Sequence, residues 1–176
     1  GQAYCWLGEN EKAQIILEEA LQKPGENHLI VLQLIALYHK SGNSSAWQAL
    51  LDRRLVSVND LMESGDSFFY QENYSAALDW YRIALFSEPS LKLVWERWQS
   101  IGLKYENKKD WQQASAVYQA ALEYQEQLGL APFRASFLFR LGVNLERLGD
   151  SANKDAAGHY YDQAIADGYF LDETDL

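Results

Sequence analysis

The chain has 176 residues, of which 48% are hydrophobic and 14% aromatic, and it carries a formal net charge of −10. This apolar content is enough to form a buried core, so the composition excludes global disorder. The acidity argues against nucleic acid and anionic membrane surfaces as partners, because both bind clustered Lys and Arg side chains. The longest apolar stretch, residues 29–38, has about half the ~20 residues of a membrane-spanning helix, which excludes insertion of this segment.

One pattern recurs along the chain, and the second copy keeps only part of it. A complete copy has a small residue in a first helix, then an alanine, a large residue four positions later and another small residue in a second helix. The copies span residues 1–25, 27–56, 58–90, 95–129 and 132–168, and the first begins inside its first helix. Five helix pairs are therefore expected, the first of them incomplete, with no β-strand.

The last three copies are the clearest. They read Leu61-x2-Ser64-Gly65-x2-Phe68 with Ala77-x3-Tyr81-x2-Ala84, Trp98-x2-Ile101-Gly102-x2-Tyr105 with Ala114-x3-Tyr118-x2-Ala121, and Leu138-x2-Leu141-Gly142-x2-Leu145 with Ala157-x3-Tyr161-x2-Ala164. Helices ~8–10 Å apart need small residues where their backbones approach, so we expect the glycines to pack against the first alanine of each copy. The tyrosines should fill the space between adjacent pairs. In the second copy, Arg53 stands where a small residue is expected.

This pattern resembles the tetratricopeptide repeat, in which Trp-x2-Leu-Gly-x2-Tyr, Ala-x3-Phe and Pro mark two antiparallel helices recurring about every 34 residues. The resemblance covers nearly the whole chain. It implies an all-α fold, a right-handed α–α superhelix of helix hairpins that forms one solenoid over residues 1–176. The pattern is interrupted at both ends, so we expect the sequence to be part of a longer protein whose exposed end repeats self-associate.

No catalytic or metal site is expected. His28, His39 and His159 lack the spacing of metal ligands, and Cys5 is the only cysteine. There is no phosphate-binding glycine loop and no nucleophile motif. Carboxylate pairs such as Glu18 and Glu19 are typical of solvated helix faces. The sequence therefore predicts a non-enzymatic protein without cofactors, and a cytoplasmic location is favoured.

The resemblance implies that a peptide or helix of a partner protein binds in a concave groove lined by the first helices. The matching apolar residues are Val31, Ile35, Tyr38, Met62, Phe69, Leu103, Phe139 and Val143, and the acidic residues among them are Glu63, Asp66 and Glu106. In the second copy, a separate stripe with Leu34 at its centre already supplies a core-packing face. We therefore expect a partner with hydrophobic and basic residues. Burial of the surplus stripe within the array stays open as the alternative.

Other functions also stay open. The family's clamp for acidic C-terminal tails uses Lys and Asn, whereas the matching positions here include Glu63, Asp66 and Glu96, which would repel a carboxylate. The chain could instead be a tethering or regulatory module of a larger enzyme or membrane polymerase. The repeat glycines are 37 and 40 residues apart at positions 65, 102 and 142, which weakly suggests the peptide-sensing domain of a transcription factor.

Overall fold

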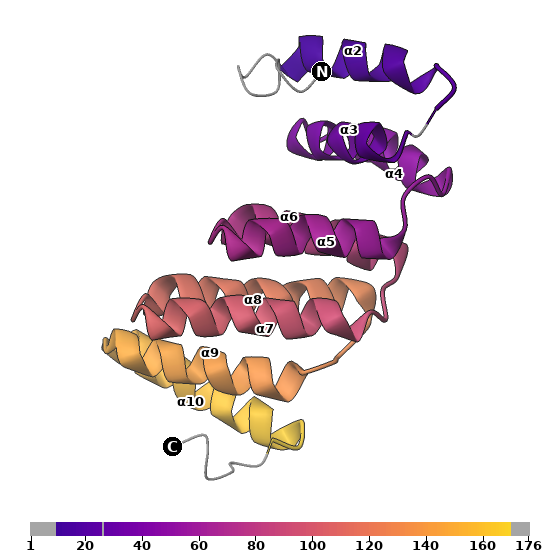
Figure 1. Cartoon of the computed structure of the whole chain (residues 1–176). Coiled ribbons are helices and arrows are strands. Elements are labelled where there is room, and N and C mark those ends of the chain that lie inside the picture. Colours follow the sequence, from indigo (N-terminus) through magenta and orange to yellow (C-terminus); the bar gives the residue numbers. More distant parts are fainter. Residues whose placement is uncertain (1–9, 26, 170–176) are drawn as a thin grey trace. The chain divides into compact units, whose positions relative to one another are not determined.

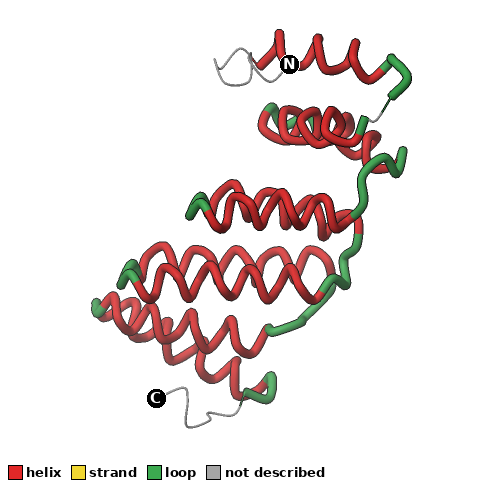
Figure 2. Tube along the Cα trace, viewed as in Figure 1, coloured by secondary structure: helices red, strands yellow, loops and turns green. Residues whose placement is uncertain are grey.

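The computed structural model describes residues 10–25 and 27–169, and these residues form nine α-helices and no strand (Figures 1 and 2). The helices are α2 (Asn10–Leu21), α3 (His28–Lys40), α4 (Ser44–Asp52), α5 (Val58–Tyr70), α6 (Tyr74–Ser87), α7 (Lys92–Asn107), α8 (Trp111–Leu128), α9 (Arg134–Leu148) and α10 (Ser151–Ala166). The all-α prediction is confirmed. The predicted first helix of the first pair falls on residues 1–9, outside the described residues. Among the helices described, none is both long and apolar enough to span a bilayer.

The chain divides into two compact units, residues 1–64 and 65–176, with the boundary inside α5. We call them the N-terminal and the C-terminal unit and describe each by itself. The expected single solenoid and its right-handed superhelix depend on how the two units are placed, so both stay predictions.

The turns before α4, α6, α8 and α10, inside the helix pairs that the structure describes in full, have the same local structure. A residue with positive φ precedes the second helix, and the next residue is an Asn or Asp whose side chain accepts a hydrogen bond from the backbone three residues later. The positive-φ residues are Gly42, Glu72, Lys109 and Gly149. The capping residues are Asn43, Asn73, Asp110 and Asp150, before α4, α6, α8 and α10. The pairs are therefore built by one repeated turn.

In the N-terminal unit, α3 packs against both α2 and α4. Five of its residues are buried, among them Leu34 at 0% exposure. The second helix of this pair is short, since α4 ends at Asp52 and Arg53 is its exposed C-cap. Arg53 therefore replaces a small residue without penalty because it lies beyond the helix.

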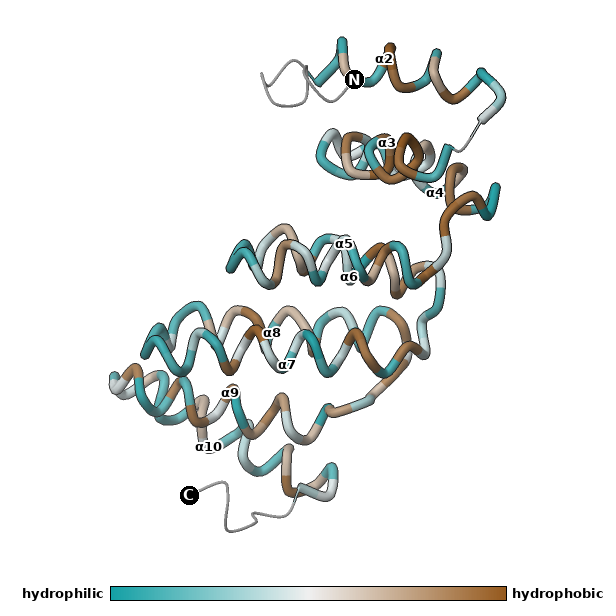
Figure 3. The backbone as a smooth tube through the Cα atoms, viewed as in Figure 1, coloured by the Kyte–Doolittle hydropathy of each residue, from teal (hydrophilic) through white to brown (hydrophobic). Residues whose placement is uncertain are grey.

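In the C-terminal unit, apolar residues recur along each helix (Figure 3). Many of them are buried and form the core of this unit. Trp95 and Trp98 of α7 are fully buried, with ring centroids 5.6 Å apart. The indole nitrogen of Trp98 donates to the carbonyl oxygen of Val117 in α8 at 2.9 Å. This bond satisfies a polar group that burial would otherwise penalise.

The atoms nearest to the repeat glycines belong to tyrosine rings, and the alanines that the sequence suggested are not the closest neighbours. A Cβ atom at Gly65 would lie 2.4 Å from the Tyr81 ring, and one at Gly102 would lie 2.3 Å from the Tyr118 ring. At Gly142 the nearest atoms are Cε1 and Cδ1 of Tyr161, at 2.6 and 2.8 Å, and the Ala157 carbonyl oxygen follows at 3.2 Å. Each tyrosine therefore covers the glycine of its own pair. Tyr118 also lies near the next pair, as expected, since its ring centroid is 6.0 Å from that of Phe137.

Candidate protein-binding face

The predicted site residues of the N-terminal unit are mostly core residues. Val31 and Ile35 are 0% exposed, and Met62 is 5% exposed. The surplus apolar stripe of α3 is buried because the helix is packed on two sides, so Val31 and Ile35 do not offer the apolar surface that we expected. Met62 is likewise closed to a partner, whereas Glu63 is exposed.

Tyr38 is also largely buried, and its hydroxyl donates a hydrogen bond of 2.5 Å to the Glu18 carboxylate. Burial is the main cause that raises the pKa of Tyr38 to about 12, and the bond to Glu18 and its negative charge add to the effect. Tyr38 therefore fastens α3 to α2, and its polar atom is already used inside the unit.

In the C-terminal unit, polar bonds join the first helices to one another. Arg97 of α7 binds Asp66 of α5 through two parallel bonds of 2.7 and 2.9 Å. Glu106 of α7 accepts bonds from α9, from Arg140 at 3.2 Å and from Asn144 at 2.7 Å. These bonds place residues 65–70 of α5, then α7, then α9 side by side.

The same bonds change the expected electrostatics of the site. Asp66 and Glu106 were expected to attract Lys or Arg of a partner, but each already binds an arginine of this chain. Burial by itself raises the pKa of Asp66, yet the bonds from Arg97 and from the Tyr81 hydroxyl, at 2.6 Å, outweigh it and keep that pKa below its ordinary value. Asp66 is therefore an ionised, internally paired carboxylate at neutral pH, and so a poor basis for partner selection.

The remaining predicted residues of this unit are partly exposed apolar side chains on first helices, and they share one helical register. They lie three positions before, one after or four after the repeat glycine, which is the i, i+4, i+7 spacing of one helix face. The residues are Phe69, Leu103, Phe139 and Val143, and we call them the first-helix face.

Each end of this face has an aromatic neighbour. The Phe69 ring lies 5.5 Å from the ring of Tyr70, which is 75% exposed. The Phe139 ring stacks on Tyr169 at 4.5 Å. Sequence reasoning missed Arg97 and Asn144. The sequence did contain a signal for Arg97, because Asp66 and Arg97 have opposite charges and lie about one repeat apart on first helices.

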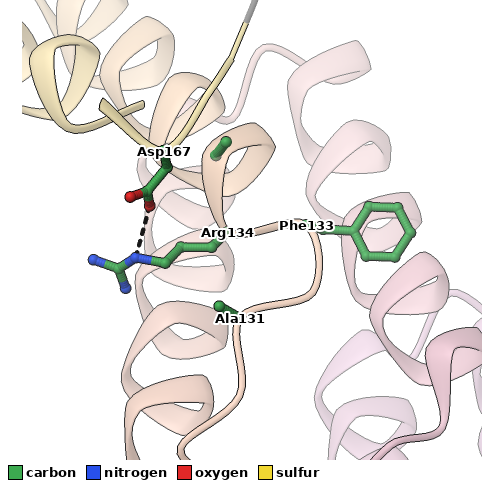
Figure 4. A pocket seen from close by; sticks show the side chains of 5 residues that line it. Ala131, Phe133, Arg134 and Asp167 are labelled. Carbon is green, nitrogen blue, oxygen red and sulfur yellow. Dashed lines mark hydrogen bonds and ion pairs between the residues drawn. The ribbon is translucent and has the colours of Figure 1, made fainter. Parts of the chain in front are cut away.

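A separate pocket of about 410 Å³ lies where the α8–α9 connection meets the end of α10 (Figure 4). Arg134 and Asp167 form an ion pair of 2.9 Å on one side, and Phe133 points away from that pair. Ala131 and Ala135 complete the lining. The pocket presents a neutralised ion pair and methyl groups, without a nucleophile beside a base.

The part of the chain that the structure describes brings together no three His, Cys, Asp or Glu side chains that could hold a metal ion. The recurring glycine–tyrosine contact, turn and cap are what define the architecture of the chain.

The chain has a helical-repeat fold.

No protein-family model matches the sequence, and no curated protein matches it. Among solved structures, one titled "Crystal structure of MamA" is similar to this chain, with 18% identity and a TM-score of 0.41. The match covers 93% of this chain and 91% of that one. A likeness at this level carries no argument about function, so the function rests on the residues of this chain.

Proposed function

We propose that this chain is a non-enzymatic protein-interaction scaffold of the tetratricopeptide-repeat type, whose first-helix face binds a segment of a partner protein. One observation carries the proposal. Phe69, Leu103, Phe139 and Val143 are partly exposed, share one register and lie on helices that the arginine–carboxylate bonds hold side by side. Apolar surface at repeated positions on adjacent rigid helices suits a peptide with regularly spaced hydrophobic anchors.

The partner's basic residues have a smaller role in this proposal than its apolar ones. Asp66 and Glu106 are neutralised by Arg97 and Arg140. Glu146, at the register of Glu106 in the last pair, is exposed and accepts a bond of 2.9 Å from the Tyr161 hydroxyl. Glu146 is therefore the carboxylate of this face that best suits a Lys or Arg of the partner, chiefly by steering association.

A library of random peptides displayed on phage, selected against the whole chain, tests the proposal. Selected peptides should carry two or more large apolar residues. Phe69→Ala and Phe139→Ala should each weaken their binding by about 2 kcal/mol, or roughly thirtyfold, because large aromatic anchors carry most of the binding energy of such a surface. Phe86→Ala is the matched control, because Phe86 is 44% exposed on the second helix α6.

Two results would contradict this site. The first is that Phe69→Ala and Phe139→Ala both bind the selected peptides as tightly as the unsubstituted chain does. The second is that a photo-reactive group in the peptide crosslinks only to the second helices α8 or α10. Self-association is a further part of the proposal, and it concerns a different surface.

A further inference from the structure

The last helix, α10, has an exposed stripe that its packing in the chain does not explain. Lys154, Gly158, Asp162 and Ile165 are all exposed and lie at i, i+4, i+8 and i+11, along one side of the helix. Ile165 is 67% exposed. This side adjoins the inner face, where Ala157 and Ala164 are buried.

The earlier second helices bury the same position. Leu85 in α6 and Leu122 in α8 lie at the register of Ile165, four residues after the repeat tyrosine, and are 0% and 9% exposed. Ile165 is therefore a residue of the core-forming type on a helix side that nothing in the described chain covers.

Gly158 is a second observation on the same stripe. It lies in the middle of α10, where glycine is less favourable than alanine. A Cβ atom at Gly158 would have no neighbouring heavy atom within 4 Å. Contacts within the described chain therefore give no reason for the missing side chain. A glycine on an exposed helix side permits close approach of another helix backbone.

The charges of the stripe are arranged symmetrically about this glycine. Lys154 lies four residues before Gly158 and Asp162 lies four residues after it. Neither side chain forms an ion pair within the part of the chain that is described. If two α10 helices cross antiparallel at Gly158, each Lys154 faces the Asp162 of the other copy. Ile165 lies seven residues after Gly158, and Ser151 lies seven residues before it. In this crossing each Ile165 therefore lies over the Ser151 of the other copy, which is small and exposed.

We propose that α10 is a self-complementary docking surface for a second copy of this chain, with a two-fold axis passing near Gly158. The proposal goes beyond the peptide-binding function and uses none of the first-helix face. A helix of 16 residues is about 24 Å long. One such helix per partner buries less than the ~1,200 Å² of a stable specific interface, so the dimer is weak and reversible.

Charge reversal tests the two-fold arrangement. Sedimentation equilibrium of the full chain, at about 0.02–1 mM, should show a monomer–dimer equilibrium. Lys154→Glu or Asp162→Lys alone should weaken it roughly tenfold, because each replaces two attractive pairs by two repulsive ones. An equimolar mixture of the two variants should form heterodimers, and the double variant should recover self-association. Lys23→Glu makes the same charge change at an exposed position far along the sequence and is the control.

A monomer throughout this concentration range would overturn the proposal, as would single variants that dimerise normally or a mixture that fails to associate. Gly158→Leu separates loss of the interface from loss of the fold. It removes an unfavourable helix glycine at an open position, so its thermal midpoint should be kept or raised. Its dimer should nonetheless be lost, because two leucine side chains block the crossing. A normal dimer in this variant would also refute the axis at Gly158.

Discussion

Gly102 approaches Tyr118 so closely that one added methyl group should destabilise the protein. In Gly102→Ala the new Cβ would lie 2.3 Å from Cζ and 2.5 Å from Cε1 and Oη of the Tyr118 ring. Unstrained carbon atoms lie about 3.5–4.0 Å apart, so the overlap exceeds ~1 Å. The ring is fully buried and its centroid lies 6.0 Å from that of Phe137, so it cannot move without disturbing the core.

The expected magnitude combines two opposing effects. Overpacking lowers the free energy of unfolding by roughly 1–3 kcal/mol, whereas replacing glycine by alanine inside a helix raises it by about 0.5–1 kcal/mol. The difference between these ranges is about 0–2.5 kcal/mol, and the overlap of more than ~1 Å with a fully buried ring places Gly102→Ala in the upper half, at a loss of about 1–2 kcal/mol. Gly102→Leu should lose more. For a chain of this size, each kcal/mol corresponds to about 2–4 °C in the thermal midpoint.

Thermal unfolding followed by circular dichroism measures the effect. The matched control is Gly158→Ala, in which the new methyl group meets no heavy atom within 4 Å and should stabilise the chain by about 0.5–1 kcal/mol. Tyr118→Leu should cost less in the Gly102→Ala background than in the unsubstituted chain, because the smaller side chain relieves the overlap. If Gly102→Ala and Gly158→Ala raised the midpoint equally, the glycine–tyrosine contact would have no energetic role and the reasoning would be wrong.

Three further predictions concern the turns and the polar bonds. Lys109 has φ of 58° at a turn position where two other pairs have glycine. Lys109→Gly should therefore stabilise the chain by about 0.5–1 kcal/mol, measured by urea denaturation. A lower stability of this variant would contradict backbone strain at the turn. The lowered pKa of Asp66 means that its contribution is present above the unfolded pKa near ~3.9 and is lost as the pH falls below it. Asp66→Asn should therefore lower stability at pH 7 and flatten the acid side of the stability–pH curve, whereas an unchanged acid limb would refute the pairing with Arg97. Burial and the bond to Asp66 raise the pKa of Tyr81, so its contribution is present below the unfolded pKa near ~10 and is lost at higher pH; Tyr81→Phe should cost about 1–2 kcal/mol at pH 7 and weaken that alkaline loss.

The all-helical fold could be predicted from sequence because helix-forming patterns are local. Ala114, Tyr118 and Ala121 follow the helical period, and the structure has α8 over them. The contact partners of the repeat glycines were harder to assign. Spacing alone does not say whether the alanine or the large tyrosine of the second helix lies over Gly102, since both occupy its inner face.

The candidate site was less predictable because exposure is a tertiary property. The sequence shows that α3 is apolar on most sides, which fits either a binding surface or a doubly packed helix, and the burial of Val31 and Ile35 favours the second. The acidic residues were misjudged for a related reason. Asp66 was read with its own helix, whereas its charge is balanced by Arg97 from the next pair.

The bonds between first helices differ from one junction to the next. Asp66 lies one position after the repeat glycine of α5, and its partner Arg97 lies five positions before that of α7. Glu106 lies four positions after the glycine of α7, and Arg140 lies two before that of α9. The two junctions therefore use different combinations of positions.

This difference has a consequence for shuffling the helix pairs as modules. If α5–α6 followed α7–α8, Glu106 would face the position two before the glycine of α5, which is Glu63, and two carboxylates would repel each other. If α9–α10 followed α5–α6 directly, Asp66 would face the position five before the glycine of α9, which is Phe137. The helix pairs share one architecture but are not interchangeable. Each junction is stabilised by an ion pair between specific positions, and these positions carry opposite charges only in the native order.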